Sequence, residues 1–183
     1  KRISNNYPEG FFFFIIGPNK ETKNKEEDYY ICLSRLSKFA GYITINISSP
    51  NTEGLRDFHD QGELKKLLTG LDKIIKEKKI KCPIAIKISP DIKDNEISKI
   101  VELVSSHNIK GIVISNTTDS NRENLFDMKK NETGGLSGQP LKDISTKLIK
   151  RFYRETKGKI KIIGVGGVDS GQSAFEKITA GAD

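Results

Sequence analysis

The sequence predicts an α/β fold with a parallel sheet, and three observations lead to this prediction. Short apolar runs alternate with helical patterns along the 183 residues. The apolar runs are continuous rather than alternating, as in parallel strands covered on both faces. The helical patterns gather their apolar residues on one stripe with a period of about 3.6 residues. Repeated βα units of this kind form either a doubly wound sheet or a barrel.

Five runs rich in apolar and β-branched residues mark the expected strands. They are Phe11–Ile16, Ile43–Ile47, Ile84–Ile88, Gly111–Ser115 and Ile160–Val165. The first is the longest apolar run in the chain, and we expect it to form a buried strand. None approaches the 18 or so apolar residues that span a bilayer, so the sequence predicts no membrane-spanning helix and a soluble chain.

Helical patterns separate the expected strands. The clearest runs from Glu63 to Lys79 and carries one apolar stripe, formed by Leu64, Leu67, Leu68, Leu71, Ile74 and Ile75. The same repeat returns at Ile97, Ile100, Val101 and Val104, and again at Leu148, Ile149 and Phe152. These patterns define roughly five βα units, whereas a complete (β/α)8 barrel has eight in about 250 residues. Without a linker or a low-complexity tract, residues 1–183 are expected to form a single domain.

The composition limits the kinds of partner that the chain is expected to bind. The formal net charge is +7, but the lysines are interleaved with acids on polar helix faces, so we expect no nucleic-acid partner. The two cysteines, Cys32 and Cys82, lie far apart in apolar surroundings and form no CxxC motif. They are expected to be buried thiols of a protein in a reducing compartment, and the sequence predicts no metal site.

Polar residues follow the expected strands at the edge that holds the active site of parallel α/β barrels. They are Asn46 to Thr52, Lys87, Asn116 to Thr118, the loop Gly134 to Gly138, and Gly166-Gly167. Any one cluster is readily explained by turns and helix caps, and Lys87 can extend its ammonium to the surface instead of meeting an anionic ligand. Together they indicate a pocket for a phosphate-bearing cofactor and a small, planar, hydrogen-bonding substrate.

Five ordered motifs carry a resemblance to a known family. The segment NISSPNTEGLR, from Asn46 to Arg56, closely resembles the signature of dihydroorotate dehydrogenases, which usually have Pro where this chain has Glu53. IAIKISPD, GIVISNTT, GGLSGQPL and IIGVGGVDS follow in the same order as in that family. The resemblance implies an incomplete (β/α)8 TIM barrel of about five central units, in which the family's first strands and its last strand are lacking.

The resemblance also implies a reaction. Family members oxidise dihydroorotate to orotate in pyrimidine (UMP) synthesis and pass the hydride to FMN. Ser49 occupies the position of the catalytic base, as in the class 2 enzymes, which pass electrons to quinone and associate peripherally with the cytoplasmic side of the inner membrane. By the same comparison, the residues that bind substrate are Asn46, Asn51, Asn116 and Thr117. Those that contact FMN are Asn46, Lys87, Ser115, Gly138 and Gly167.

Two departures keep other interpretations open. Ile15 stands where the family has an Asn that contacts the flavin, and Lys1 to Gly10 match no familiar pattern. A branched apolar side chain cannot replace the hydrogen bonds of an amide. One alternative is therefore a non-catalytic barrel fragment that has lost flavin binding. Another is a different FMN-dependent barrel oxidoreductase, against which the context of Ser49 and the motif ending in Thr118 both argue.

Overall fold

A computed structural model describes residues 11–52, 54–120, 122–123 and 125–183. Its sheet has five parallel strands in the order β1-β2-β3-β4-β5. The strands are β1 (Phe13–Ile16), β2 (Tyr42–Asn46), β3 (Ile84–Lys87), β4 (Gly111–Ile114) and β5 (Lys161–Gly164). All five predicted strands are present, with ends that differ by one or two residues, and neighbours in sequence are neighbours in the sheet.

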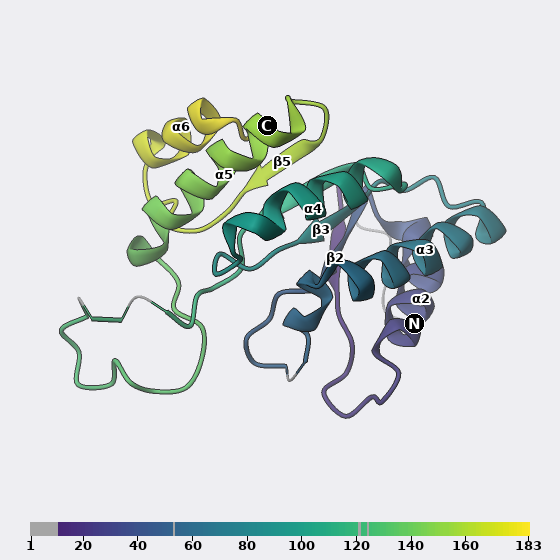
Figure 1. Ribbon diagram of the computed structural model, residues 1–183, viewed down its shortest axis with the longest axis horizontal. Coiled ribbons are helices and arrows are strands. Elements are labelled where there is room, and N and C mark those ends of the chain that lie inside the picture. Colours follow the sequence, from purple (N-terminus) through teal and green to yellow (C-terminus); the bar gives the residue numbers. More distant parts are fainter. Residues whose placement is uncertain (1–10, 53, 121, 124) are drawn as a thin grey trace.

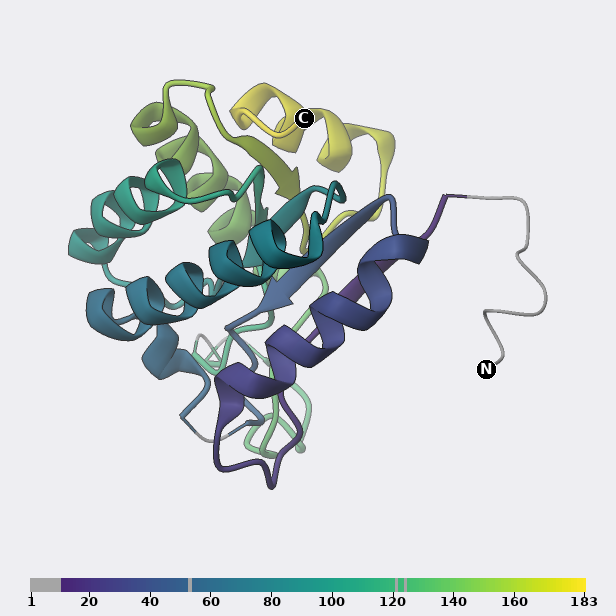
Figure 2. The ribbon, with the colours of Figure 1, turned by 90° about the vertical axis from the view of Figure 1, so that its right-hand side faces the viewer.

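In the described part of the chain, five α-helices alternate with the strands. They are α2 (Lys25–Leu36), α3 (Gln61–Lys78), α4 (Asp94–Ser106), α5 (Lys142–Thr156) and α6 (Gly171–Ala180). Successive helices contact one another in chain order, and the row they form is visible over the sheet in Figures 1 and 2. Asp60 begins α3 by accepting hydrogen bonds from the Gly62 and Glu63 amides, a standard N-cap.

The hydrophobic core lies between the sheet and this row of helices. Ile43 and Ile45 of β2 are fully buried there, together with the apolar stripes of α3 and α4. Side chains alternate along a strand, so Tyr42 and Asn46 lie on the opposite face. The stacked rings of Phe13 and Tyr42, with centroids 5.0 Å apart, belong to that second face. The main hydrophobic cluster therefore lies on the face that the helices cover, while Ala85 and Val113 are also buried on the second face.

The expectation that Phe11–Ile16 is a buried strand was wrong. Only Ile16 is buried, whereas Phe13 and Ile15 are 53% and 52% exposed. Among the described strands, β1 lies at the edge of the sheet and pairs with β2 alone, and it presents these two side chains on the face that the helices do not cover. Cys32 and Cys82 are also partly rather than fully buried, although both pack against the core.

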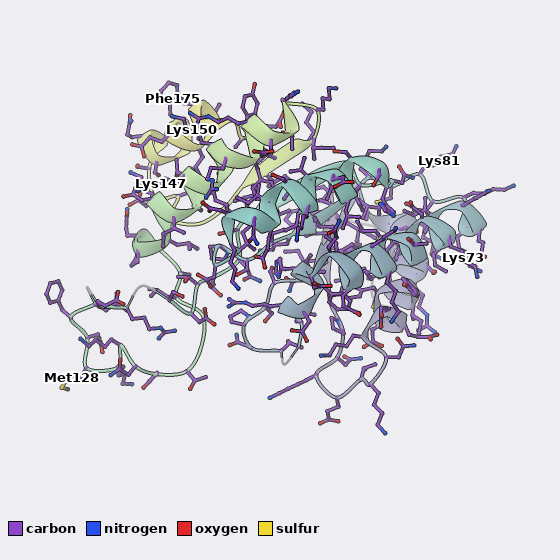
Figure 3. All side chains as sticks on the ribbon, viewed as in Figure 1. Lys73, Lys81, Met128, Lys147, Lys150 and Phe175 are labelled. Atoms are coloured by element: carbon purple, nitrogen blue, oxygen red, sulfur yellow. The ribbon has the colours of Figure 1, made fainter. Side chains whose placement is uncertain are left out.

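Two further features concern the surface. The segment between β4 and α5 leaves the sheet as a long loop, and Met128 projects from its far side (Figures 1 and 3). Phe126 in the same loop is fully exposed. No helix in the described ranges is long and apolar enough to cross a membrane. Residues 1–10 and Glu53, two of the places where the sequence departs from the family pattern, lie outside the described residues.

Candidate active site

Parallel pairing brings the polar strand ends together at one edge of the sheet. Asn46, the last residue of β2, is in register with Lys87, the last residue of β3. Beyond the next strand, the Asn116 amide donates to the Ile88 carbonyl at 2.9 Å and the Ser115 amide donates to the Val165 carbonyl at 3.2 Å. The ends of β2 to β5 thus stay in step, as predicted for a site at the carboxyl edge.

An amide–hydroxyl cluster joins the ends of β2 and β4. The Asn116 Nδ2 donates to Asn46 Oδ1 at 3.2 Å and to Ser48 Oγ at 3.0 Å. The Ser48 hydroxyl donates in turn to Asn46 Oδ1 at 3.0 Å. Ser48 is fully buried, while both amides are half-buried. Each side chain restrains the other two, so the cluster presents its remaining polar atoms in a defined geometry.

Two neighbours fix the orientation of this cluster. The buried Tyr29 hydroxyl of α2 donates to the Asn46 backbone carbonyl at 2.5 Å and anchors the end of β2. On the other side, the Thr117 amide donates to Asn116 Oδ1 at 2.8 Å. That bond leaves the Asn116 NH2 group to face Asn46 and Ser48. Gly135 packs so closely on Thr117 that a Cβ there would lie 1.8 Å from the Thr117 hydroxyl.

Ser49 and Asn51 occupy the loop that follows β2. The Ser49 Oγ accepts a hydrogen bond from the Asn51 backbone amide at 3.3 Å. Within the described part of the chain, the Ser49 hydroxyl donates to no acceptor, and neither a carboxylate nor an imidazole contacts it. Asn51 is exposed, and its side chain is not drawn into the cluster. The structure therefore places Ser49 beside the cluster, but Asn51 at its rim.

Lys87 brings a positive charge to this edge. Its side chain is half-buried at the end of β3, on the same face as Asn46. Among the described residues, its ammonium has no hydrogen-bond or ion-pair partner. Burial lowers the pKa of Lys87 from its usual value. A half-buried cation without a counterion favours an anionic or electron-rich ligand next to it.

Glycines form the side of the site near β5. Gly138 has φ +78°, and a Cβ built on it would meet no atom within 4 Å. Gly167 has φ +65°, and a Cβ there would lie 2.7 Å from the Lys142 amide nitrogen. Only glycine therefore lets the chain make this turn against the start of α5. Ser115 is buried, and its hydroxyl donates to the Asn116 carbonyl at 3.0 Å.

A charged cluster that we did not predict supports the site from outside. Arg56 donates from Nη2 to Asp91 at 3.1 Å and from Nη1 to Asp119 at 2.9 Å. The Thr118 hydroxyl donates to Asp91 Oδ1 at 2.5 Å, and the Asp119 amide donates to Asp91 Oδ2 at 3.3 Å. Burial raises the pKa of Asp91, whereas the bond from Arg56 lowers the pKa of Asp119.

This cluster ties three active-site loops together. Arg56 ends the motif that contains Ser49, while Asp91 follows β3 and Asp119 follows the Asn116-Thr117 pair. The sequence contained a signal, because Arg56 and Asp91 each close a family motif. Nothing in their spacing indicated that they pair with each other.

Fold and site together define a class of protein. Five parallel βα units with polar loops at the carboxyl ends of their strands form part of a (β/α)8 barrel. The family model for dihydroorotate dehydrogenase matches residues 3–183, and the chain belongs to that family. The match begins at residue 3, so it includes most of the N-terminal segment that resembled no familiar pattern.

Individual relatives agree with this assignment. The dihydroorotate dehydrogenase (quinone) of Salmonella typhi is 43% identical over 95% of this chain, which covers 54% of that protein. A crystal structure of ligand-free DHODH from Eimeria tenella matches 99% of the chain with a TM-score of 0.89 at 33% identity, and 55% of that chain is covered. The ferulenol complex from the same organism matches 92%, with a TM-score of 0.87 at 35% identity and 49% of that chain covered. The present chain thus spans about half the length of the relatives it matches.

Proposed function

We propose that this chain provides the central βα units, within a single FMN-binding domain, of an enzyme that oxidises dihydroorotate to orotate in pyrimidine synthesis. The observation that carries the proposal is the amide–hydroxyl cluster of Asn46, Ser48 and Asn116, with Ser49 and Lys87 at the same sheet edge. Amides both donate and accept hydrogen bonds, which suits a cyclic ureide that bears a carboxylate. The identity to quinone-type relatives supports the same reaction.

Substrate binding is assigned to Asn46, Asn51, Asn116 and Thr117. Asn46 and Asn116 already hold each other in place, so they lose little side-chain freedom when the substrate binds. Asn51 is exposed, and its amide is available to a ligand at the rim. Ser49 acts as the base that takes the proton from C5 of the substrate. A serine hydroxyl is weakly basic at neutral pH, so this transfer needs a relay through water or a neighbouring hydroxyl.

The residues present fit FMN. FMN supplies the acceptor for the hydride that leaves C6 of the substrate. Asn46, Lys87 and Ser115 are assigned to the flavin ring, with the Lys87 ammonium favouring negative charge beside it. Gly138 and Gly167 are assigned to close backbone contact, Gly167 on the phosphate side. Open space beside Gly138 and the left-handed turn at Gly167 support that assignment.

Ile15 favours a second candidate, a barrel fragment that no longer binds flavin. Its side chain lies in register with Thr44 on the uncovered face of the sheet, where the family has an amide. An isoleucine makes no hydrogen bond to a flavin ring. The other residues assigned to the flavin, which are Lys87, Ser115 and the two glycines, are all present and favour the enzyme over this alternative.

Quinone is the proposed electron acceptor, on the strength of the quinone-type relatives. A peripheral position on the cytoplasmic side of the inner membrane is proposed only for the full-length protein. No nucleic-acid partner is proposed.

The test uses the full-length polypeptide encoded by the gene, mixed with FMN and then desalted. A retained visible flavin band that bleaches anaerobically with dihydroorotate is the expected result. A colourless protein would overturn the proposal of an enzyme and favour the barrel fragment that no longer binds flavin. A flavin band that dihydroorotate fails to bleach would instead indicate another FMN-dependent barrel oxidoreductase.

A further inference from the structure

Lys177 of α6 is a buried lysine that the proposed reaction does not use. Its residue is only 2% exposed. The ammonium donates to Ser145 Oγ at 2.5 Å, to Thr146 Oγ1 at 3.0 Å and to the Lys142 carbonyl at 3.4 Å, all in the first turn of α5. Within the described ranges, it has no carboxylate at ion-pair distance. The nearest acid along the helix, Glu176, pairs instead with Lys142 at 2.8 Å.

One hydroxyl links this ammonium to the glycine turn. Ser145 Oγ accepts from Lys177, and its single proton is shared between two acceptors, the Lys142 carbonyl at 3.1 Å and the Gly166 carbonyl at 3.2 Å. Gly166 and Gly167 both have positive φ, and they pack against the start of α5 too tightly for any side chain. The turn therefore takes its shape from the first turn of α5, which Lys177 holds from behind.

The turn also carries backbone donors without an acceptor. In the described part of the structure, the backbone amides of Gly166, Gly167 and Val168 donate to no acceptor. Consecutive free amides in a left-handed turn form a concave binding site for an anion. Since Lys177 lacks a paired carboxylate, an anion bound at this turn would supply its counter-charge.

We propose that Lys177 is a positioning residue for the phosphate group of the cofactor. It holds the Gly166-Gly167 turn through Ser145 and places a positive charge without a directly paired carboxylate on the α5 side of that turn. Lys177 touches neither substrate nor phosphate in this role. The inference rests on the proposed function, because it assumes that the anion at this turn is the FMN phosphate. Burial lowers the pKa of Lys177, and the nearby Lys142 acts in the same direction.

The experiment compares FMN with riboflavin, which has the same ring and no phosphate. Both are titrated into the flavin-free full-length polypeptide, and binding is followed by quenching of flavin fluorescence. In Lys177→Met, the Kd for FMN should rise about tenfold, a change of about 1.4 kcal/mol, while the Kd for riboflavin stays unchanged. Lys150→Met removes an exposed lysine from α5 and should leave both constants unchanged.

Other outcomes are equally clear. If Lys177 has a purely structural role, Lys177→Met should weaken the binding of FMN and of riboflavin equally, and that result would overturn the proposal. If Lys177→Met does not fold, Ser145→Ala removes the linking hydroxyl and leaves the charge in place. It should reduce the preference for FMN over riboflavin, and an unchanged preference would reject the proposal. A wild-type protein that binds neither flavin would overturn the proposed function. One that binds both equally would overturn only the assignment of Lys177.

Discussion

The Asn116 side chain donates a hydrogen bond of 3.2 Å to Asn46, although the two residues are 70 positions apart in the chain. This bond crosses from the end of β4 to the end of β2, past the end of β3. The buried Ser48 hydroxyl accepts from the same NH2 group at 3.0 Å. The proposed substrate site is therefore held together before any ligand arrives.

Replacing Asn116 by Asp should destabilise the protein. The carboxylate oxygen would face Asn46 Oδ1, which keeps its bonds from Ser48, and the buried Ser48 Oγ would be left without a donor. Such a loss costs about 1–3 kcal/mol. Urea unfolding at pH 7 measures the change in free energy. Asn51→Asp makes the same chemical change at an exposed position and should alter stability by less than about 0.5 kcal/mol. Equal effects in both variants would contradict the role of the cluster.

Removing the Ser49 hydroxyl should slow flavin reduction. In Ser49→Ala the proton at C5 of dihydroorotate has no base, and a lost acid–base group costs about 10²–10⁴ in rate. Anaerobic stopped-flow measurement of flavin bleaching, from pH 6 to pH 10, records the effect. Ser49→Cys should restore part of the rate and shift the pH profile towards the pKa of a thiol, which is about 8.5. A rate that Ser49→Ala leaves unchanged at every pH would show that Ser49 is not the base.

Replacing Lys87 by Met should separate stability from activity. The half-buried ammonium has no partner among the described residues, so its removal should stabilise the flavin-free protein by about 0.5–2 kcal/mol. The same variant should bind FMN more weakly or reduce it more slowly, because the positive charge beside the ring is lost. Thermal unfolding and flavin titration measure the two effects. If both quantities stay at wild-type values, Lys87 simply extends into solvent.

The strands could be predicted from the sequence because burial of both faces of a central strand leaves a continuous apolar run, as in Ile84, Ala85 and Ile86. The same rule failed for β1, since a run such as Phe13–Ile16 does not show whether anything covers its second face. Lys177 was also missed. Its place on α6 looks like a solvated helix position, and its burial depends on how α5 packs against α6.

The gathering of polar strand ends at one edge of the sheet could be predicted from the sequence. Asn46, Lys87 and Asn116 each follow an apolar run, and parallel topology places such ends at one edge. Arg56 and Asp91 are different, because an ion pair between loops 35 residues apart leaves no periodic trace in the sequence. Pairings of this kind become visible only in three dimensions.

Weakening the Arg56 ion pairs should loosen the substrate loops. Lysine cannot reach Asp91 and Asp119 together, whereas the planar guanidinium donates to both. In Arg56→Lys we expect KM for dihydroorotate to rise more than kcat falls, because the loops bearing Ser49 and Thr117 lose their common support. Arg151→Lys alters an exposed pair with Asp94 on the helices and should leave both constants unchanged. A fall in kcat alone would assign Arg56 to the chemical step instead.

Acid should destabilise the fold through His59. The residue is 7% exposed, its Nε2 accepts from the Ser89 amide at 3.2 Å, and its Nδ1 donates to the Arg56 carbonyl at 2.9 Å. The bond at Nε2 requires the neutral imidazole, because a protonated ring has no acceptor there, and burial lowers the pKa of His59 below its usual 6.5. Below pH 6.5, His59 is therefore protonated in the unfolded chain while it stays neutral in the folded chain. Stability is complete above that pH and is lost as the pH falls towards the folded-state pKa.

The measurement is the urea midpoint at pH 8, 7, 6 and 5. Each unit by which the two pKa values of His59 differ contributes about 1.4 kcal/mol to the loss. His59→Gln should be less stable at pH 8 but lose less stability on acidification than the wild type. His107→Gln removes the other histidine, which is not enclosed in this way, and should keep the full acid-dependent loss. If His59→Gln loses as much stability as the wild type between pH 7 and pH 5, the buried imidazole is not the group that senses acid.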